Sequence, residues 1–153
     1  MVEELLSGNE EFSKGILQVS GEQLKEQREN TVEGQTPKVL VVTCSDSRVV
    51  PEFLFNKGIG EIFVIRTAGE RVDDVALGSI EYGIEHLNIK EVVVLGHESC
   101  GAVKGAFSNI EGDTPLAKLL NEIKDVIVAK GFTENEIEKA VEENVKDVIR
   151  KIR

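Results

Sequence analysis

Four side chains with metal-binding chemistry lie at two places in the sequence. Cys44 and Asp46 follow one run of mostly β-branched apolar residues, and His97 and Cys100 follow another. Thiolate, imidazole and carboxylate are groups that zinc accepts in proteins, and a catalytic zinc site keeps one position for water. The two pairs together predict a zinc site that the fold assembles from both places.

Cysteines also occur in proteins for reasons unrelated to a catalytic zinc. Free cysteines are often buried in cores as small apolar side chains. A redox pair of Cys44 and Cys100 would lack the Cys-x-x-Cys motif that is typical of such pairs. A purely structural zinc site uses cysteine and histidine in a closed tetrahedron, so an aspartate ligand is atypical of it. A cysteine phosphatase loop has arginine six positions after the cysteine, where this sequence has Val50.

The elements that must position these residues predict an α/β fold. Three apolar runs are typical of buried strands: 38–44, 61–66 and 91–96. Helical patterns follow them over 72–87, after the cap Thr114-Pro115, and after the capping box 133–136. We expect a central, mostly parallel sheet flanked by helices, with chemistry at the carboxyl ends of its strands. The helical periodicity places Ile84 and Leu116 on core-facing sides.

We interpret residues 1–153 as a single domain. Its regions are an N-terminal helical arm (1–35), an α/β core that carries the zinc site (36–110) and C-terminal helices (111–153). The arm contains two helical segments with thin apolar stripes. We expect these segments to pack on a neighbouring subunit.

Charge and hydropathy exclude several classes of partner. The net charge of −10, with no basic stripe, argues against nucleic acid because nothing offsets phosphate repulsion. No apolar run approaches the ~20 residues that a membrane-spanning helix needs. The first residues lack the basic start and apolar core of a signal peptide. With 2 cysteines and no disulfide framework, the expected location is the reducing cytoplasm.

Four motifs resemble the β-class carbonic anhydrases, over about Glu11 to Arg150. They are Cys-Ser-Asp-Ser-Arg at 44–48, Arg-Thr-Ala-Gly at 66–69, Gly-Ser-Ile-Glu-Tyr at 78–82 and His-Glu-Ser-Cys-Gly at 97–101. The resemblance implies that Cys44, His97 and Cys100 bind Zn²⁺. It implies an Asp46–Arg48 dyad, and a substrate-pocket role for Gln35. Most members continue beyond the segment matching 143–153 into a further strand, which this sequence does not contain, and many carry asparagine where Glu70 stands.

The chemistry of the dyad follows from the residue types. Two thiolates cancel the charge of zinc, so its water is less acidic than on a three-histidine site and benefits from a nearby acceptor, Asp46. The same carboxylate can bind the zinc itself in a closed state, or pair with Arg48 and leave the metal open. The main-chain N–H of Gly101, beside Cys100, is a donor for bound bicarbonate. Arg66, at a strand end, is expected to be structural and to pair with a carboxylate.

The predicted function is zinc-dependent, reversible hydration of carbon dioxide to bicarbonate. Two alternatives stay open: hydrolysis of carbonyl sulfide or carbon disulfide on the same scaffold, and a non-catalytic, zinc-stabilised protein. The resemblance also implies association through the N-terminal region, so we expect a homodimer or a higher homo-oligomer.

Overall fold

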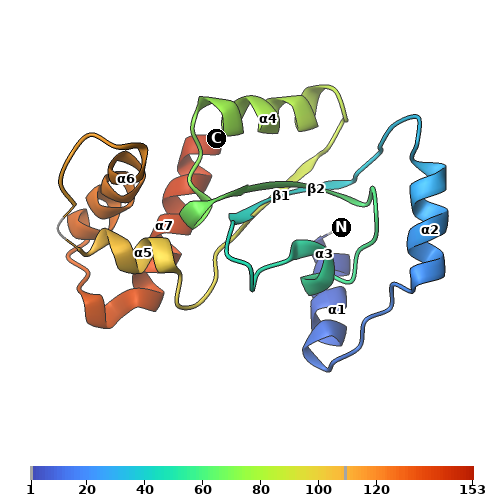
Figure 1. Cartoon of the computed structure of the whole chain (residues 1–153), viewed down its shortest axis with the longest axis horizontal. Coiled ribbons are helices and arrows are strands. Elements are labelled where there is room, and N and C mark those ends of the chain that lie inside the picture. Colours follow the sequence, from blue (N-terminus) through green and yellow to red (C-terminus); the bar gives the residue numbers. More distant parts are fainter. Residues whose placement is uncertain (1, 109) are drawn as a thin grey trace. The chain divides into compact units, whose positions relative to one another are not determined.

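The computed structural model describes residues 2–108 and 110–153. Its sheet has three parallel strands, with β1 (Val39–Cys44) between β2 (Ile62–Thr67) and β3 (Glu91–Leu95) (Figure 1). Helices flank the sheet. The predicted α/β fold is confirmed, and each strand lies within one residue of its predicted bounds.

The chain packs as two compact units, each built from separate stretches of sequence. Unit 1 contains the residues up to Val41, Arg48–Ile65 and Gly78–Val93; unit 2 contains Val42–Ser47, Arg66–Leu77 and Val94–Arg153. The four residues of the predicted zinc site all belong to unit 2.

The central strand, β1, is the most buried element. All 6 of its residues are buried, as expected for an apolar run covered on both faces. The one polar side chain before Cys44 is satisfied, because the Thr43 hydroxyl donates to the Leu95 carbonyl at 2.8 Å. That bond ties the end of β1 to the end of β3, where the predicted ligands follow.

Unit 1 contains the two N-terminal helices, α1 (Val2–Ser13) and α2 (Gly21–Asn30). It also contains α3 (Pro51–Leu54) and the later part of α4 (Asp74–Glu85). Gly8 lets α1 pack against the end of α3, because any side chain there would overlap the Phe55 carbonyl. A capping box of Ser20 and Gln23 starts α2, and none of the 10 residues of α2 is buried. That exposure fits the expectation that the arm packs elsewhere, which stays a prediction.

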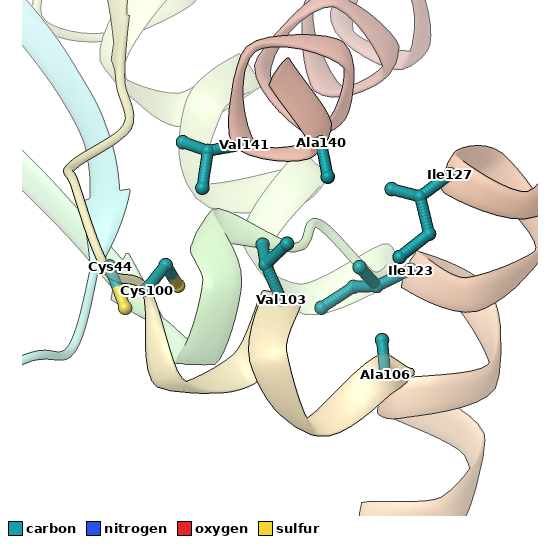
Figure 2. Close-up of a cluster of buried hydrophobic side chains, with 8 residues drawn as sticks. All are labelled: Cys44, Cys100, Val103, Ala106, Ile123, Ile127, Ala140 and Val141. Atoms are coloured by element: carbon teal, nitrogen blue, oxygen red, sulfur yellow. The ribbon is translucent and has the colours of Figure 1, made fainter. Parts of the chain in front are cut away.

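Unit 2 surrounds the predicted site with helices. They are η1 (Ala68–Glu70), α5 (Gly101–Ala106), α6 (Pro115–Ala129), η2 (Glu134–Glu136) and α7 (Ile137–Ile152). The predicted caps are present: the Thr114 hydroxyl accepts from Ala117 N, and Thr133 and Glu136 form a capping box. α5, α6 and α7 pack on one another around one core, formed by Cys44, Cys100, Val103, Ala106, Ile123, Ile127, Ala140 and Val141 (Figure 2).

Two residues expected in the core are exposed. Leu116 is 65% exposed although the helical period places it on the same side of α6 as Ile123 and Ile127; it is the second residue of the helix, and the buried residues of α6 begin only at Ala117. Ile84 is 41% exposed, while Ile80 is buried. Gly83, also buried, lies within side-chain reach of Leu40, so α4 approaches β1 through its glycine.

Among the described residues, no helix combines the length and apolar character that crossing a membrane requires.

Candidate metal centre

The structure brings together three of the predicted ligands. Cys44 ends β1, His97 lies two residues beyond β3, and Cys100 is the N-cap of α5. Their ligand atoms all lie within 4.8 Å of one another. Both thiols are buried, and in Figure 2 their sulfur atoms lie side by side at one end of the unit 2 core. Residues far apart in sequence meet because the ends of two neighbouring strands meet.

The imidazole of His97 is oriented for metal binding. Its Nδ1 lies 3.0 Å from the Glu98 carbonyl oxygen, which can only accept, so Nδ1 carries the proton. Nε2 therefore presents a lone pair, and it is buried with no hydrogen-bond partner. A buried acceptor without a partner beside two thiols is the arrangement expected of a metal ligand.

The two thiols share one negative charge in the absence of a cation. The Cys100 thiol, donating to Cys44, lowers the pKa of Cys44 most, and the main-chain N–H groups of Gly69, at 3.3 Å, and of Asp46 lower it further against the effect of burial. The pKa of Cys100 is correspondingly raised, first by its bond to Cys44 and then by burial. N–H donors around a cysteine sulfur favour the thiolate, which is the form that binds metal.

Asp46 lies next to the three ligands without joining them. Its Oδ2 is 3.9 Å from His97 Nε2, and its side chain is 18% exposed. Among the described residues, the group whose ligand atoms are all mutually close consists of Cys44, His97 and Cys100 alone. The carboxylate is thus near the place where a fourth ligand or a water would sit.

Arg66 holds the main chain between Cys44 and Asp46. Its Nε donates to the Cys44 carbonyl at 3.1 Å, and its Nη2 donates to the Asp46 carbonyl at 2.7 Å. The structural role predicted for Arg66 therefore acts through main-chain carbonyls. A guanidinium presents several donors in a fixed plane, which suits it to this use.

The remaining predicted site residues lie in irregular or terminal positions. Arg48 is exposed in the turn after β1, and Gln35 is exposed in the segment that precedes β1 in unit 1. Gly101 is the first residue of α5, is exposed, and has no atom within 4 Å of where a side chain would begin. Their roles stay predictions.

A buried polar network that the sequence did not reveal lies behind the site. Asn144 of α7 and Glu70 of η1 are both completely buried, and Arg71 is nearly so. Burial raises the pKa of Glu70 to about 7, with its bond from Asn144 opposing that rise. The sequence signal was weak, because a single asparagine among charged and apolar helical residues is typical of an exposed position.

The donor set fits a soft or borderline cation such as zinc. Two sulfurs and one imidazole nitrogen are the ligands that zinc favours, whereas magnesium and calcium favour oxygen. The lone pair on His97 Nε2 and the lowered pKa of Cys44 also suit a cation of the zinc type. These observations identify a metal-binding cluster.

Comparisons with known proteins agree with this assignment. The sequence model of the carbonic anhydrase family matches residues 39–153. The chain is 44% identical over 110 residues to carbonic anhydrase 2 of Mycobacterium tuberculosis, covering 72% of this chain and 53% of that protein. It is 48% identical over 91 residues to a carbonic anhydrase of Mycolicibacterium smegmatis, covering 59% of this chain and 44% of the relative. The matched region spans about half the length of these two proteins.

Solved structures are similar over nearly the whole chain. A β-carbonic anhydrase of Coccomyxa, in complex with acetazolamide, superposes with a TM-score of 0.77 at 28% identity, covering 99% of this chain and 71% of that one. The β-carbonic anhydrase CafA of Aspergillus fumigatus also gives 0.77, at 25% identity, over 99% of this chain and 74% of its own. With its family match, its fold and its two-cysteine, one-histidine cluster, the chain belongs to the β-carbonic anhydrase family.

Proposed function

We propose that this chain catalyses the reversible hydration of carbon dioxide to bicarbonate and a proton, with zinc held by Cys44, His97 and Cys100. The observation that carries the proposal is the meeting of the three ligand atoms within 4.8 Å of one another at the ends of β1 and β3. Membership of the family supplies the reaction, since the relatives are named carbonic anhydrases.

A zinc ion bound there would supply a Lewis acid that makes water nucleophilic near neutral pH. Asp46 orients the reacting water and accepts a hydrogen bond from it, a role supported by the 3.9 Å between its Oδ2 and His97 Nε2. Arg48, two residues on, restrains the carboxylate through a bidentate pair. Arg66 fixes the main chain from which Asp46 projects.

The substrate and product require little from the pocket. Carbon dioxide is small and offers few groups to hydrogen-bond, whereas bicarbonate is an anion that accepts hydrogen bonds. The main-chain N–H of Gly101 would donate a hydrogen bond to bicarbonate, and the open space beside this residue supports such an approach. For the Gln35 amide, a role as a donor to the substrate is supported by the resemblance of the sequence motifs alone.

The position of Asp46 also favours a second candidate function. A carboxylate this near His97 Nε2 could close the fourth metal position permanently, which would give a zinc-stabilised protein without hydratase activity. Such a protein would bind the same metal with the same ligands. Metal content and activity therefore have to be measured on the same sample.

The test is elemental analysis of the purified protein followed by stopped-flow hydration of carbon dioxide between pH 6 and pH 9. We expect one zinc per chain and activity that disappears in the matched Cys100→Ser variant. Full zinc occupancy without activity at any pH would favour the closed, non-catalytic protein. Activity that persists without zinc would contradict both candidates.

We further propose that the protein is a homodimer, or a multiple of one, in the cytoplasm. Unit 1 exposes several large apolar side chains, among them Leu17, Val32 and Phe53. β-Carbonic anhydrases of Sordaria macrospora, 26% identical with a TM-score of 0.76 over 97% of this chain and 79% of theirs, are described as tetrameric. The two unpaired thiols suit a reducing compartment.

A further inference from the structure

The turn that follows β2 has an unusual backbone. Gly69 has φ 63° and Glu70 has φ 46°, so two consecutive residues adopt the left-handed region. Glycine does so at no cost, but a residue with a Cβ is disfavoured there by about 1 kcal/mol or more. The surrounding structure must therefore hold this turn in place.

The turn donates a hydrogen bond to one ligand of the metal centre. The main-chain N–H of Gly69 points at the Sγ of Cys44, 3.3 Å away. Both residues are buried, so water does not compete for this donor. The direction of this N–H depends on the left-handed conformation of Gly69.

Asn144, on α7, binds the same turn from the other side. Its Nδ2 donates to the Gly69 carbonyl and to Glu70 Oε1, each at 2.8 Å. Its Oδ1 accepts from Arg71 Nη1 at 3.1 Å. One completely buried side chain thus contacts all three residues from Gly69 to Arg71.

The amide of Asn144 has one orientation that satisfies these partners. Arg71 can only donate, while the Gly69 carbonyl and the Glu70 oxygen accept. Exchanging Oδ1 and Nδ2 would therefore place donor against donor and acceptor against acceptor. Arg71 is itself anchored, because its Nη1 also donates to Asp147 Oδ2 at 2.9 Å. The network fixes both the side chain and the turn.

We propose that Asn144 is a positioning residue for the metal centre: by holding the left-handed turn, it keeps the Gly69 N–H on the Cys44 sulfur and so sets the donor strength of that thiolate. The inference rests on the proposed function in that it assumes a metal bound by Cys44. Asn144 itself does not contact the substrate; it acts only through Gly69.

The consequence for a bound cation follows from the hydrogen bond. A thiolate that accepts an N–H donates less electron density to its metal than one without it. Losing the bond raises the energy of the filled sulfur orbitals, so sulfur-to-metal charge transfer needs less energy. It also removes preorganisation of the ligand, and loss of such supporting contacts weakens metal binding by about 10- to 100-fold.

Cobalt(II) replacement provides a direct readout, because the sulfur-to-cobalt charge-transfer band is visible in absorption. We expect Asn144→Ala to shift this band to longer wavelength and to weaken cobalt binding about tenfold or more in competition with a chelator. The matched control is Val148→Ala, which truncates a completely buried residue one turn further along α7. That variant should be destabilised yet keep the wild-type band.

A second variant and a second measurement cover a failure to fold. Asn144→Asp keeps an acceptor for Arg71 but loses both donors to the turn, so it should shift the band in the same direction. In the wild-type protein loaded with ¹¹³Cd, the Gly69 amide should show a scalar coupling to the metal through Cys44 sulfur.

The outcomes separate this inference from the proposed function. If wild-type protein binds no cobalt and shows no thiolate band, the proposed metal centre is wrong. If wild type binds cobalt and the band is unchanged in whichever Asn144 variant folds, the positioning role is wrong while the proposed function stands. Absence of the Gly69 coupling in cadmium-loaded protein would equally overturn the positioning role. Equal band shifts in Asn144→Ala and Val148→Ala would mean that the shift comes from a general loss of packing, and the positioning role of Asn144 would be wrong.

Discussion

Glu70 is a carboxyl group whose ionisation is disfavoured by its surroundings. It is completely buried, one carboxyl oxygen accepts from Asn144, and the other has no partner among the described residues. Burial raises its pKa from 4.5 to about 7. A carboxyl that is more easily protonated in the folded than in the unfolded chain stabilises the fold at low pH, and this contribution is lost as the pH rises from about 4.5 to about 7.

The first prediction is that Glu70→Gln stabilises the metal-free protein above pH 7. Glutamine keeps an oxygen to accept from Asn144 and removes the buried charge. The gain should be on the order of 2–3 kcal/mol at pH 8 and close to zero below pH 4.5, where Glu70 is protonated in both states. Urea unfolding of chelator-treated wild type and variant at several pH values measures it. A difference in stability that does not change with pH would contradict the assignment.

The second prediction concerns the dyad of Asp46 and Arg48. Asp46→Asn removes the acceptor that orients the reacting water and should lower kcat/KM by about 100-fold. Arg48→Ala frees the carboxylate to approach the metal, so activity should fall while one zinc stays bound. Because both changes break the same unit, the double variant should be no worse than the poorer single variant. Hydration rates and zinc content of all four proteins test this, and additive losses would argue for independent roles.

At the scale of elements, a glycine beside a ligand sets how closely α7 approaches. A Cβ on Gly96, the residue before His97, would lie 2.6 Å from Val145 Cγ2 and 3.1 Å from Val141 Cγ1. Contacts this short force a packed helix to shift. The position of α7 and the position of the imidazole are therefore linked through Gly96.

The third prediction is that Gly96→Ala destabilises the protein by about 1–3 kcal/mol and weakens zinc binding. Adding Val145→Ala removes the nearer contact, so the double variant should be more stable than the sum of the single changes predicts. Gly78→Ala is the control. It is exposed on α4 with no atom near its added methyl group, and it should stabilise by about 0.5–1 kcal/mol. Urea midpoints measure all these proteins, and a neutral Gly96→Ala would refute the close approach.

The elements that were predicted well are those specified by local signals. The strand runs, the Thr114 cap and the Thr133–Glu136 capping box depend on neighbours in sequence, and all are present. Meeting of Cys44 with His97 and Cys100 was also predictable, because parallel strands end at one edge. Burial of Asn144 was not, since its partners are more than 70 positions away in sequence. The exposure of Leu116 does not follow from periodicity either, because periodicity indicates the apolar side of a helix but not where along its axis the core begins.

For the molecule as a whole, unit 1 has apolar surface that its own residues do not cover. Leu17 and Phe53 are each 51% exposed and Ile59 is 42% exposed. These three, with Val19 and Leu24, line a mostly apolar depression of about 320 Å³, which we call the unit 1 depression. Contiguous apolar surface on a protein otherwise rich in charge is typical of an association site. Leu116, at 65%, is more exposed than these three but lies on α6, in unit 2, which makes it a suitable comparison.

The fourth prediction is that the unit 1 depression lies in the homodimer interface. Sedimentation velocity at micromolar concentration should show dimer or a multiple of it for wild type. Leu17→Glu places a charge where apolar surface is buried by association, so it should shift the protein towards monomer. Leu116→Glu adds the same charge to an exposed leucine of unit 2 and should leave the assembly unchanged. Dissociation by both variants would indicate general electrostatic repulsion in this acidic chain, and dissociation by neither would place the interface elsewhere.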